Sequence, residues 1–234
     1  MTIEPPEVII LSTQRSGTHL LQSMLGCHSL VQTRGEFILD YRRKRAAGIL
    51  EPELDPAAIA GFRYRRRPGF VNLGIVMYGQ IAEFERWCGS LLSCKIVHLI
   101  RDPLQVAKSR LQMKRDREVL GDKFRAHYHA HHTATLPPVY TDPDEVALAE
   151  QIRISQTHHL KLLEGNPNVL TLSYEEICNN KQVSHLDAAL GQRLFSFLGL
   201  DAEDVRTHLV KTSERGSGVN GLRVNEDLQV SSSE

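Results

Sequence analysis

The sequence has no excess of either charge, no long apolar run and no clustered cysteines. Its 28 lysines and arginines balance 28 aspartates and glutamates over 234 residues, so bulk charge does not favour nucleic acid or a membrane surface. No apolar run approaches the ~20 residues that a membrane-spanning helix needs, and the N-terminal MTIEPPEV is unlike a secretory signal. The four cysteines are scattered, without metal-ligand or disulfide-framework spacing. We therefore expect a cytoplasmic protein that neither binds nucleic acid nor inserts into a membrane.

The length fits one α/β domain that spans residues 1–234. Two stretches, 40–69 and 115–144, interrupt the regular pattern of strands and helices, and we expect them to be insertions of this domain. From about residue 225 the chain is polar and serine-rich, which predicts a flexible tail.

The segment from Val8 to Gly26 organises the chain, because it predicts a strand, a tight loop and a helix in succession. Four apolar residues at 8–11 form the strand, and Leu20, Leu21, Met24 and Leu25 recur at helical spacing. The unpaired N–H groups and the dipole at a helix N-terminus favour a phosphate or sulfate there. Gly17 lets the backbone curl around such an anion, and Arg15 adds a fixed cation. The same segment is also compatible with an ordinary strand-to-helix turn.

The loop lacks the features of an ATP- or GTP-binding loop. Such loops have two glycines separated by four residues and a lysine directly after the second. Only one glycine lies between residues 12 and 18, and no lysine follows it. A typical P-loop kinase is therefore disfavoured.

A second strand-to-helix junction follows at residues 95–113, KIVHLIRDPLQVAKSRLQM. Asp102 is a favourable N-cap and Pro103 a favourable first helical residue. Ser109 lies close to two helical turns after Asp102 and so shares its side of the helix. Arg101 at the strand end and Ser109 on that face can bind one phosphate between them. The alternative is a plain junction in which Arg101 forms a salt bridge.

These two segments together resemble the PAPS-dependent sulfotransferases, closest to the bacterial carbohydrate-type enzymes. The run QRSGTHLL at 14–21 resembles the family's 5′-phosphosulfate loop, and Arg101-Asp-Pro followed by Ser109 resembles its 3′-phosphate motif. The resemblance implies an α/β fold, a three-layer sandwich with a central, mostly parallel sheet of the P-loop NTPase-like sulfotransferase type. It also implies 3′-phosphoadenosine 5′-phosphosulfate (PAPS) as co-substrate, PAP as product and no metal.

The resemblance also assigns roles to residues. Glu36 in its Gly-Glu context corresponds to the general base, although most glutamates are solvated surface residues. Arg15 corresponds to the group that neutralises charge on the leaving phosphate. The donor-binding residues that it implies are Arg15, Ser16, Gly17, Thr18, His19, Leu20, Arg101, Ser109, Tyr174, Lys211, Arg215 and Gly216. Simple core packing is the alternative for Tyr174, and a flexible tail is the alternative for the last three.

Other segments depart from the family pattern or carry no motif. Ile75 and Val76 stand where a lysine is frequent, so the contribution of that lysine is in doubt here. The histidine cluster at 127–132 could bind a metal, but we favour a loop over the acceptor pocket. The resemblance predicts a small-molecule or carbohydrate acceptor, and a homodimer stays open. An atypical nucleotide-dependent kinase and a non-catalytic nucleotide-binding module are the two rival functions.

The rest of the chain predicts a regular alternation of elements. We expect strands at 29–33, 70–78 and 169–172 and helices at 80–92, 144–164 and 186–198, with a capping box formed by Ser173 and Glu176. Val146 and Leu160 are expected to point inward, and His98 is expected in the core. Arg110 is expected to face solvent or the mouth of the substrate site.

Overall fold

The computed structural model describes residues 5–33, 35–36, 67–120, 145–178, 188–201 and two short strands at 209–211 and 222–224. The main sheet contains β1 (Val8–Ser12), β2 (Val31–Thr33), β3 (Val71–Met77), β4 (Lys95–Ile100) and β5 (Val169–Ser173). The described helices are α1 (Thr18–Leu25), α4 (Ile81–Cys88), α5 (Pro103–Leu120), α7 (Glu145–Leu163), α8 (Tyr174–Ile177) and α9 (Ala188–Leu198). Two 3₁₀ turns, η1 (Tyr78–Gln80) and η2 (Leu91–Ser93), flank α4, and β6 (Leu209–Lys211) pairs antiparallel with β7 (Leu222–Val224).

The five main strands are all parallel and lie in the order β2-β3-β1-β4-β5. The central strand β1 is apolar for four residues and buried at all five, as expected for a parallel strand covered on both faces. Along the chain, β1 is followed by β2 and β3, which lie on one side of it in the sheet. The later strands β4 and β5 lie on its other side. The strand order therefore reverses at β1, and ligands of such sheets bind at this point, at the carboxyl ends of the strands.

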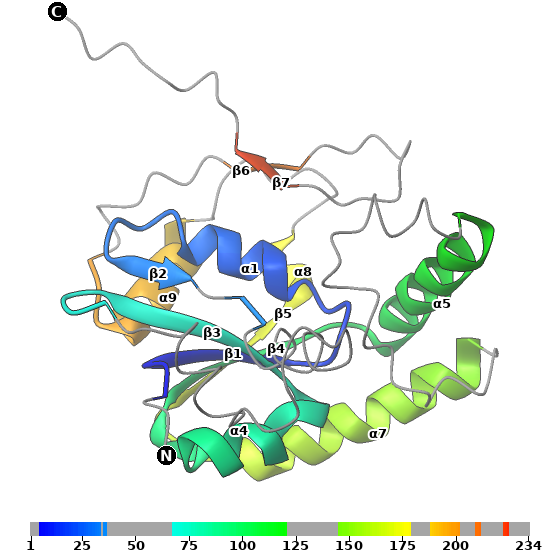
Figure 1. The fold of residues 1–234 in the computed structure, drawn as a ribbon, viewed down its shortest axis with the longest axis horizontal. Coiled ribbons are helices and arrows are strands. Elements are labelled where there is room, and N and C mark those ends of the chain that lie inside the picture. Colours follow the sequence, from blue (N-terminus) through cyan, green and yellow to red (C-terminus); the bar gives the residue numbers. More distant parts are fainter. Residues whose placement is uncertain are drawn as a thin grey trace, which may run out of the picture.

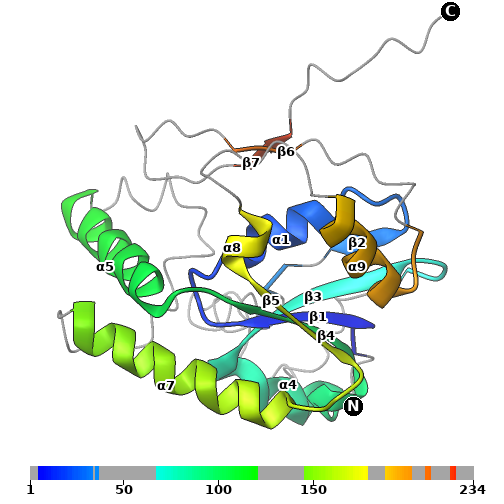
Figure 2. The same cartoon turned by 180° about the vertical axis from the view of Figure 1, so that it is seen from behind.

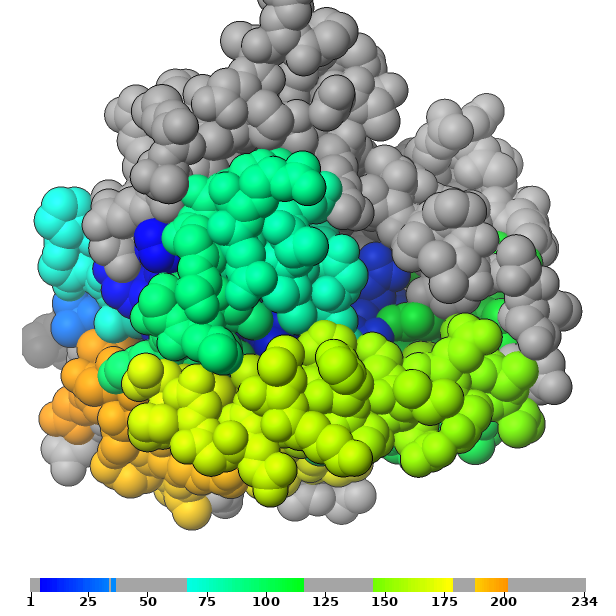
Figure 3. Space-filling view, turned by 90° about the horizontal axis from the view of Figure 1, so that it is seen from below, coloured from blue at the N-terminus to red at the C-terminus, as the bar shows by residue number. Residues whose placement is uncertain are grey.

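Helices cover both faces of the sheet, which makes the three-layer α/β sandwich that the sequence predicts (Figures 1 and 2). On one face, α1 and α9 pack in a core with Val8, Ile10 and Val97. On the other face, residues of α4 and the last residue of α7, Leu163, pack with Ile9 and Ile96. Figure 3 shows α4 and α7 side by side over this second face. The alternation of strand residues between the two cores follows from the period of two of a β-strand.

The helices α5 and α7 pack against each other beside the sheet and share a small core of their own. Val106, Ala107 and Leu111 of α5 contact Leu148 and Ile152 of α7 there. Because α5 follows β4 directly, this packing holds the start of α5 at the carboxyl end of the sheet.

Several predicted boundaries and faces differ from the structure. The helix expected at 80–92 ends at Cys88, because Gly89 takes a left-handed φ of 85° and the chain then forms η2. Val146 and Leu160 are 70% and 38% exposed, not buried. They miss the core because α7 contacts α5 through Leu148 and Ile152 and contacts the sheet through Leu163.

Candidate anion-binding site

The loop between β1 and α1 has the backbone conformation of an anion-binding turn. Arg15 has a left-handed φ of 69°, unusual for a residue with a side chain, and Gly17 has a φ of 95°. Gly17 is the N-cap of α1 and offers no side chain to the first N–H groups of the helix. No N-cap side chain therefore accepts a hydrogen bond from these groups, and successive N–H groups in such a turn form a concave site for an anion.

Gly17 is required by space as well as by conformation. A Cβ atom at this position would lie 2.4 Å from Cδ2 of Tyr174 and 2.5 Å from its Cε2, so the aromatic ring packs directly on the glycine. Tyr174 is the first residue of α8, at the end of β5. The carboxyl ends of β1 and β5 therefore meet at the loop, although the two strands are not neighbours in the sheet.

The hydroxyl of Ser16 is a buried polar group without a protein partner. The residue is 0% exposed, and its Oγ has no hydrogen bond within the described part of the chain. A buried hydroxyl without a partner costs free energy, about 1–3 kcal/mol. An oxyanion held by the N–H groups of the loop would supply the missing acceptor, so Ser16 and Gly17 together fit a bound phosphate or sulfate.

Arg101 joins the loop from the end of β4. Its Nη1 donates to the carbonyl oxygen of Arg15 at 2.9 Å, and its guanidinium lies 4.1 Å from the centre of the Tyr174 ring. Its Nε is buried and has no hydrogen-bond partner among the described residues. The backbone of Arg101 is fixed in turn by Gln156 of α7, whose Nε2 donates to the Arg101 carbonyl at 2.9 Å. Arg101 thus retains N–H donors for an anion beside the ring of Tyr174.

The two sequence motifs meet directly. Nε of Arg15 donates to Oγ of Ser109 at 3.1 Å, across 94 positions of sequence. Arg15, Ser16, Arg101 and Ser109 are therefore brought together by the ends of β1 and β4. This is the juxtaposition that the predicted two-motif nucleotide site requires.

Glu36 lies beside the first turn of α1 and forms an ion pair or charged hydrogen bond with His19. Oε1 of Glu36 is 3.2 Å from Nε2 of His19, and the side chains are 10% and 49% exposed respectively. The neighbouring Gly35 has a left-handed φ of 62°, and its carbonyl accepts a hydrogen bond from the Ile75 N–H at 2.9 Å. This bond to β3 fixes the backbone next to Glu36. The imidazole thus contacts one of the two carboxylate oxygens.

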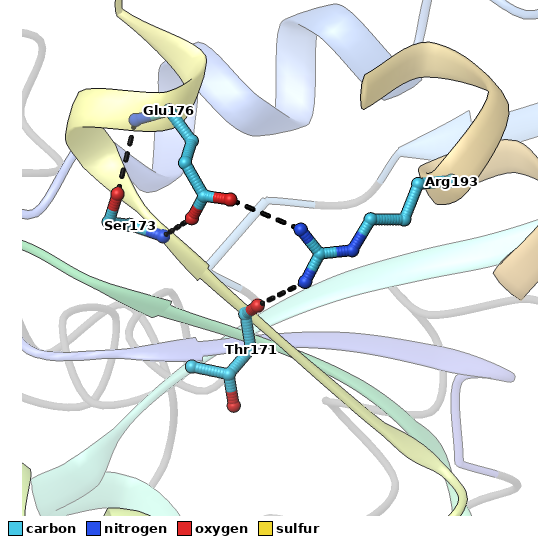
Figure 4. Close-up of polar contacts among 4 residues, drawn as sticks. All are labelled: Thr171, Ser173, Glu176 and Arg193. Carbon is cyan, nitrogen blue, oxygen red and sulfur yellow. Dashed lines mark hydrogen bonds and ion pairs between the residues drawn. The ribbon is translucent and has the colours of Figure 1, made fainter. Parts of the chain in front are cut away.

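The start of α8, whose first residue is Tyr174, is held by hydrogen bonds among Thr171, Ser173, Glu176 and Arg193 (Figure 4). The predicted capping box is present: the Ser173 N–H donates to Glu176 Oε2 at 2.6 Å, and the Glu176 N–H donates to Ser173 Oγ at 3.1 Å. Arg193 of α9 donates to Glu176 Oε1 at 3.1 Å and to the Thr171 carbonyl at 3.0 Å. The bond from the Ser173 N–H is the main cause that lowers the pKa of Glu176.

The remaining predicted donor-binding residues fall into three groups. Thr18 and Leu20 are buried in α1, and the Leu20 side chain belongs to the core, so any contact with a ligand there would use the backbone. Lys211 is the last residue of β6, a strand that the structure describes by its backbone only. Arg215, Gly216 and the histidines at 127–132 lie outside the described residues, as do most of the residues at 40–69.

The structure gives partners to Arg110, which the sequence predicted to face solvent or the mouth of the substrate site. This side chain of α5 turns toward the loop: its Nε donates to the Gln14 carbonyl at 3.2 Å, and its Nη2 contacts Oγ1 of Thr13. A cation one residue after Ser109 was visible in the sequence, but no pattern showed which side of α5 faces the loop.

A second buried polar cluster lies on the α4 and α7 side of the sheet and forms no part of the loop. His98 is 0% exposed, as predicted for a core histidine, and its Nε2 is 2.6 Å from the hydroxyl of Tyr78. Its other ring nitrogen, Nδ1, is buried and has no hydrogen-bond partner among the described residues. The Tyr78 ring stacks on His159 with centroids 3.8 Å apart. Burial, with a smaller effect of His159, lowers the pKa of His98 from 6.5 to about 4, and burial raises the pKa of Tyr78. His98 and Tyr78 are both uncharged at neutral pH.

The structure resembles several solved sulfotransferases. A sulfotransferase domain of the curacin biosynthetic pathway matches with a TM-score of 0.56 at 16% identity, over 86% of this chain and 76% of that one. A sulfotransferase from Alicyclobacillus acidocaldarius matches with a TM-score of 0.51 at 15% identity, over 87% and 84% of the two chains. A mouse sulfotransferase crystallised with PAP matches with a TM-score of 0.51 at 16% identity, over 85% and 61%.

The fold is that of the sulfotransferases. No protein-family model matches the sequence, and no curated protein matches it either. The sulfotransferase fold confirms the predicted α/β architecture. The likeness to carbohydrate-type enzymes in particular stays a prediction.

The described residues contain neither a membrane-spanning helix nor a group of metal-binding side chains. None of the described helices is long and apolar enough to cross a membrane. Within the same residues, no group of three or more histidine, cysteine, aspartate or glutamate side chains could hold a metal ion.

Proposed function

We propose that the protein is a sulfotransferase that transfers the sulfuryl group of PAPS to a hydroxyl of a small-molecule or carbohydrate acceptor. The observation that carries this proposal is the meeting of Arg15 and Ser109 at 3.1 Å beside the unpaired Ser16 hydroxyl. An anion site at the β1 loop would suit any phosphate. A second cation, Arg101, bonds to the Arg15 carbonyl, and Ser109 bonds to the Arg15 side chain, so these two residues could bind a second phosphate of the same nucleotide. The sulfotransferase fold supports the choice of donor, and one structure of this fold was crystallised with PAP.

In this reaction the chain positions two oxygens in line on either side of sulfur. The bond between sulfur and the bridging phosphate oxygen breaks, and its electron pair stays on the phosphate of PAP. A new bond forms between sulfur and the acceptor oxygen. As in phosphoryl transfer, catalysis then depends on positioning and on stabilisation of charge. Arg15 and the N–H groups around Gly17 would stabilise the charge that grows on the leaving phosphate.

Glu36 is the proposed general base that takes the proton of the acceptor hydroxyl. His19 holds one carboxylate oxygen at 3.2 Å, so the other can face the acceptor. This is the usual arrangement in which a third group orients a base. Glu36 is close to the loop, because His19, its partner, lies in the first turn of α1, directly after Gly17 and Thr18.

The first experiment is binding. Isothermal titration calorimetry should detect PAP binding without added metal, and it should detect weaker binding of ADP, which lacks the 3′-phosphate. If instead ATP with Mg²⁺ binds and PAP does not, the protein is a nucleotide-dependent kinase or another ATP-binding protein, and the proposal is wrong.

The second experiment is turnover. The protein is incubated with PAPS and a panel of sugars, alcohols and phenols, and the products are searched by mass spectrometry for the addition of one sulfuryl group. Sulfation of a sugar or an alcohol is the expected result. PAP binding without turnover over the whole panel would favour the non-catalytic nucleotide-binding module.

A further inference from the structure

We infer that Arg110 is a positioning residue that holds the anion-binding loop in its strained conformation. This inference rests on the proposed function, because the loop is taken to bind the phosphosulfate end of PAPS. Arg110 lies on α5 and contacts the loop twice, at the Gln14 carbonyl at 3.2 Å and at Oγ1 of Thr13. It is directly next to Ser109 in sequence but has a different partner, since Ser109 contacts the side chain of Arg15.

The contacts of Arg110 and Arg101 fix two successive peptide planes. Arg110 binds the carbonyl of Gln14, which belongs to the plane before the Arg15 Cα, and Arg101 binds the carbonyl of Arg15, which belongs to the plane after it. The torsion φ of Arg15, 69°, is therefore held between two planes that each have an arginine donor.

This holding is needed because the conformation of Arg15 is unfavourable for a residue with a Cβ. The left-handed region costs an L-residue about 1–2 kcal/mol, and glycine is the residue that adopts it freely. A planar trans peptide has its N–H opposite to its C=O, and no described peptide bond is cis. When the Arg15 carbonyl points to Arg101, the Ser16 N–H must point the opposite way. The arginines thus decide which way the N–H groups of the loop face.

Arg110 differs from Arg15 and Arg101 in its expected role. Its two bonds to the loop use Nε and Nη2 on one side of the guanidinium, in the fork geometry that lysine cannot reproduce. We therefore place it behind the loop as a support, and not as a ligand of the donor. Its charge also raises the local positive potential, so charge and geometry must be separated by experiment.

The test compares PAP binding by calorimetry for wild type, Arg110→Ala, Arg110→Lys and Arg115→Ala. Arg115 lies on the same helix, is 61% exposed and pairs with Glu145, so its removal deletes the same charge without a loop contact. We expect Arg110→Ala to weaken PAP binding about ten- to a hundredfold, as for the loss of hydrogen bonds from a charged donor. Arg110→Lys should be intermediate, and Arg115→Ala should stay within about twofold of wild type, as expected for an exposed charge.

Chemical rescue of PAP binding distinguishes a local role at the loop from a general contribution of Arg110 to folding stability. Free guanidinium at millimolar concentration should restore part of the PAP affinity of Arg110→Ala and should leave Arg115→Ala unchanged. If Arg110→Ala does not fold, Thr13→Val, which removes the hydroxyl partner and leaves the Gln14 carbonyl, should still weaken PAP binding by a few-fold.

Three outcomes would overturn the inference. Wild-type affinity in Arg110→Ala would show that the loop holds its shape without this side chain. Full affinity in Arg110→Lys, or an equal loss in Arg115→Ala, would show that charge alone matters. A wild-type protein that binds no PAP would instead overturn the proposed function, and the inference with it.

Discussion

Polar side chains are buried at two places near the carboxyl ends of the central strands, and the two places differ in the side chains that they gather. The loop after β1 gathers Arg15, Arg101 and Arg110 around a strained backbone, with a buried Ser16 hydroxyl that has no described partner. The cluster on the other side of the sheet consists of Tyr78, His98 and His159. Tyr78 stacks on His159, and His98 bonds to Tyr78 through Nε2, while its buried Nδ1 has no described partner.

The charge of the two clusters differs as well. The loop has three guanidinium groups, which stay charged at every pH that the protein meets. The histidine cluster is neutral, because burial lowers the pKa of His98 and of His159 and raises that of Tyr78. Guanidinium groups gathered at one loop fit an anionic ligand, whereas neutral rings that stack on one another fit a core. The following predictions test this distinction.

The largest effect is expected at Glu36, because a general base contributes to the rate and not to donor binding. Glu36→Gln should lower turnover with the acceptor found in the panel by about 10²- to 10⁴-fold. PAP affinity by calorimetry should change by less than about threefold, since the ring of His19 can still bond to the amide oxygen. Glu164→Gln is the control, because Glu164 is an exposed glutamate directly after α7. Turnover near the wild-type rate would remove Glu36 from the mechanism.

A smaller effect, measured as PAP affinity, is expected at Gly17. Gly17→Ala places a Cβ 2.4 Å from the Tyr174 ring at a φ of 95°, so the loop must change shape to relieve the contact. The relaxed loop should bind PAP about ten- to a hundredfold more weakly, which corresponds to about 1.4–2.8 kcal/mol. Gly79→Ala is the matched control, because nothing lies within 4 Å of its added Cβ. Equal PAP affinity in the two variants would mean that the loop is not the anion site.

The sequence predicted the strands and the two motifs well because these depend on local patterns. The apolar run at 8–11, the Asp102-Pro103 helix start and the Ser173–Glu176 capping box each act over a few residues, and the structure has all three. The order of the two motifs along the chain, combined with parallel strands, was enough to place Arg15 near Ser109.

What the sequence could not predict depends on how helices rotate and which partner they find. The sequence left open whether Arg110 faces solvent or the mouth of the substrate site. In the structure α5 packs on α7 through Val106, Ala107 and Leu111, and the Arg110 side chain contacts the loop. Leu160 fits an inward helical position in the periodicity, yet it is 38% exposed because no described element covers that face of α7. The spacing of apolar residues shows which of them share one face of a helix, but the neighbouring helix decides which face is buried.

The smallest effect on binding, and a distinct effect on stability, is expected at His98. Its pKa is about 4 in the folded protein and 6.5 when unperturbed, so between these values the unfolded chain takes up a proton that the folded chain does not. The free energy of unfolding should therefore fall as the pH is lowered from about 6.5 to about 4, by about 3 kcal/mol from this group. Above pH 7 the group is neutral in both states and contributes no pH dependence.

His98→Gln should remove that part of the acid sensitivity and leave PAP affinity at pH 7.5 within about twofold of wild type, since the cluster is separate from the loop. Urea unfolding of wild type and His98→Gln at several pH values gives the free energy of unfolding of each protein as a function of pH. The difference between the two pH dependences does not depend on the overall stability lost by the substitution. His158→Gln is the control, because this histidine is exposed on the same helix as His159. If His98→Gln instead weakens PAP binding as strongly as Gly17→Ala does, the cluster under the sheet is coupled to the loop, and the division between a charged site and a neutral core is wrong for this protein.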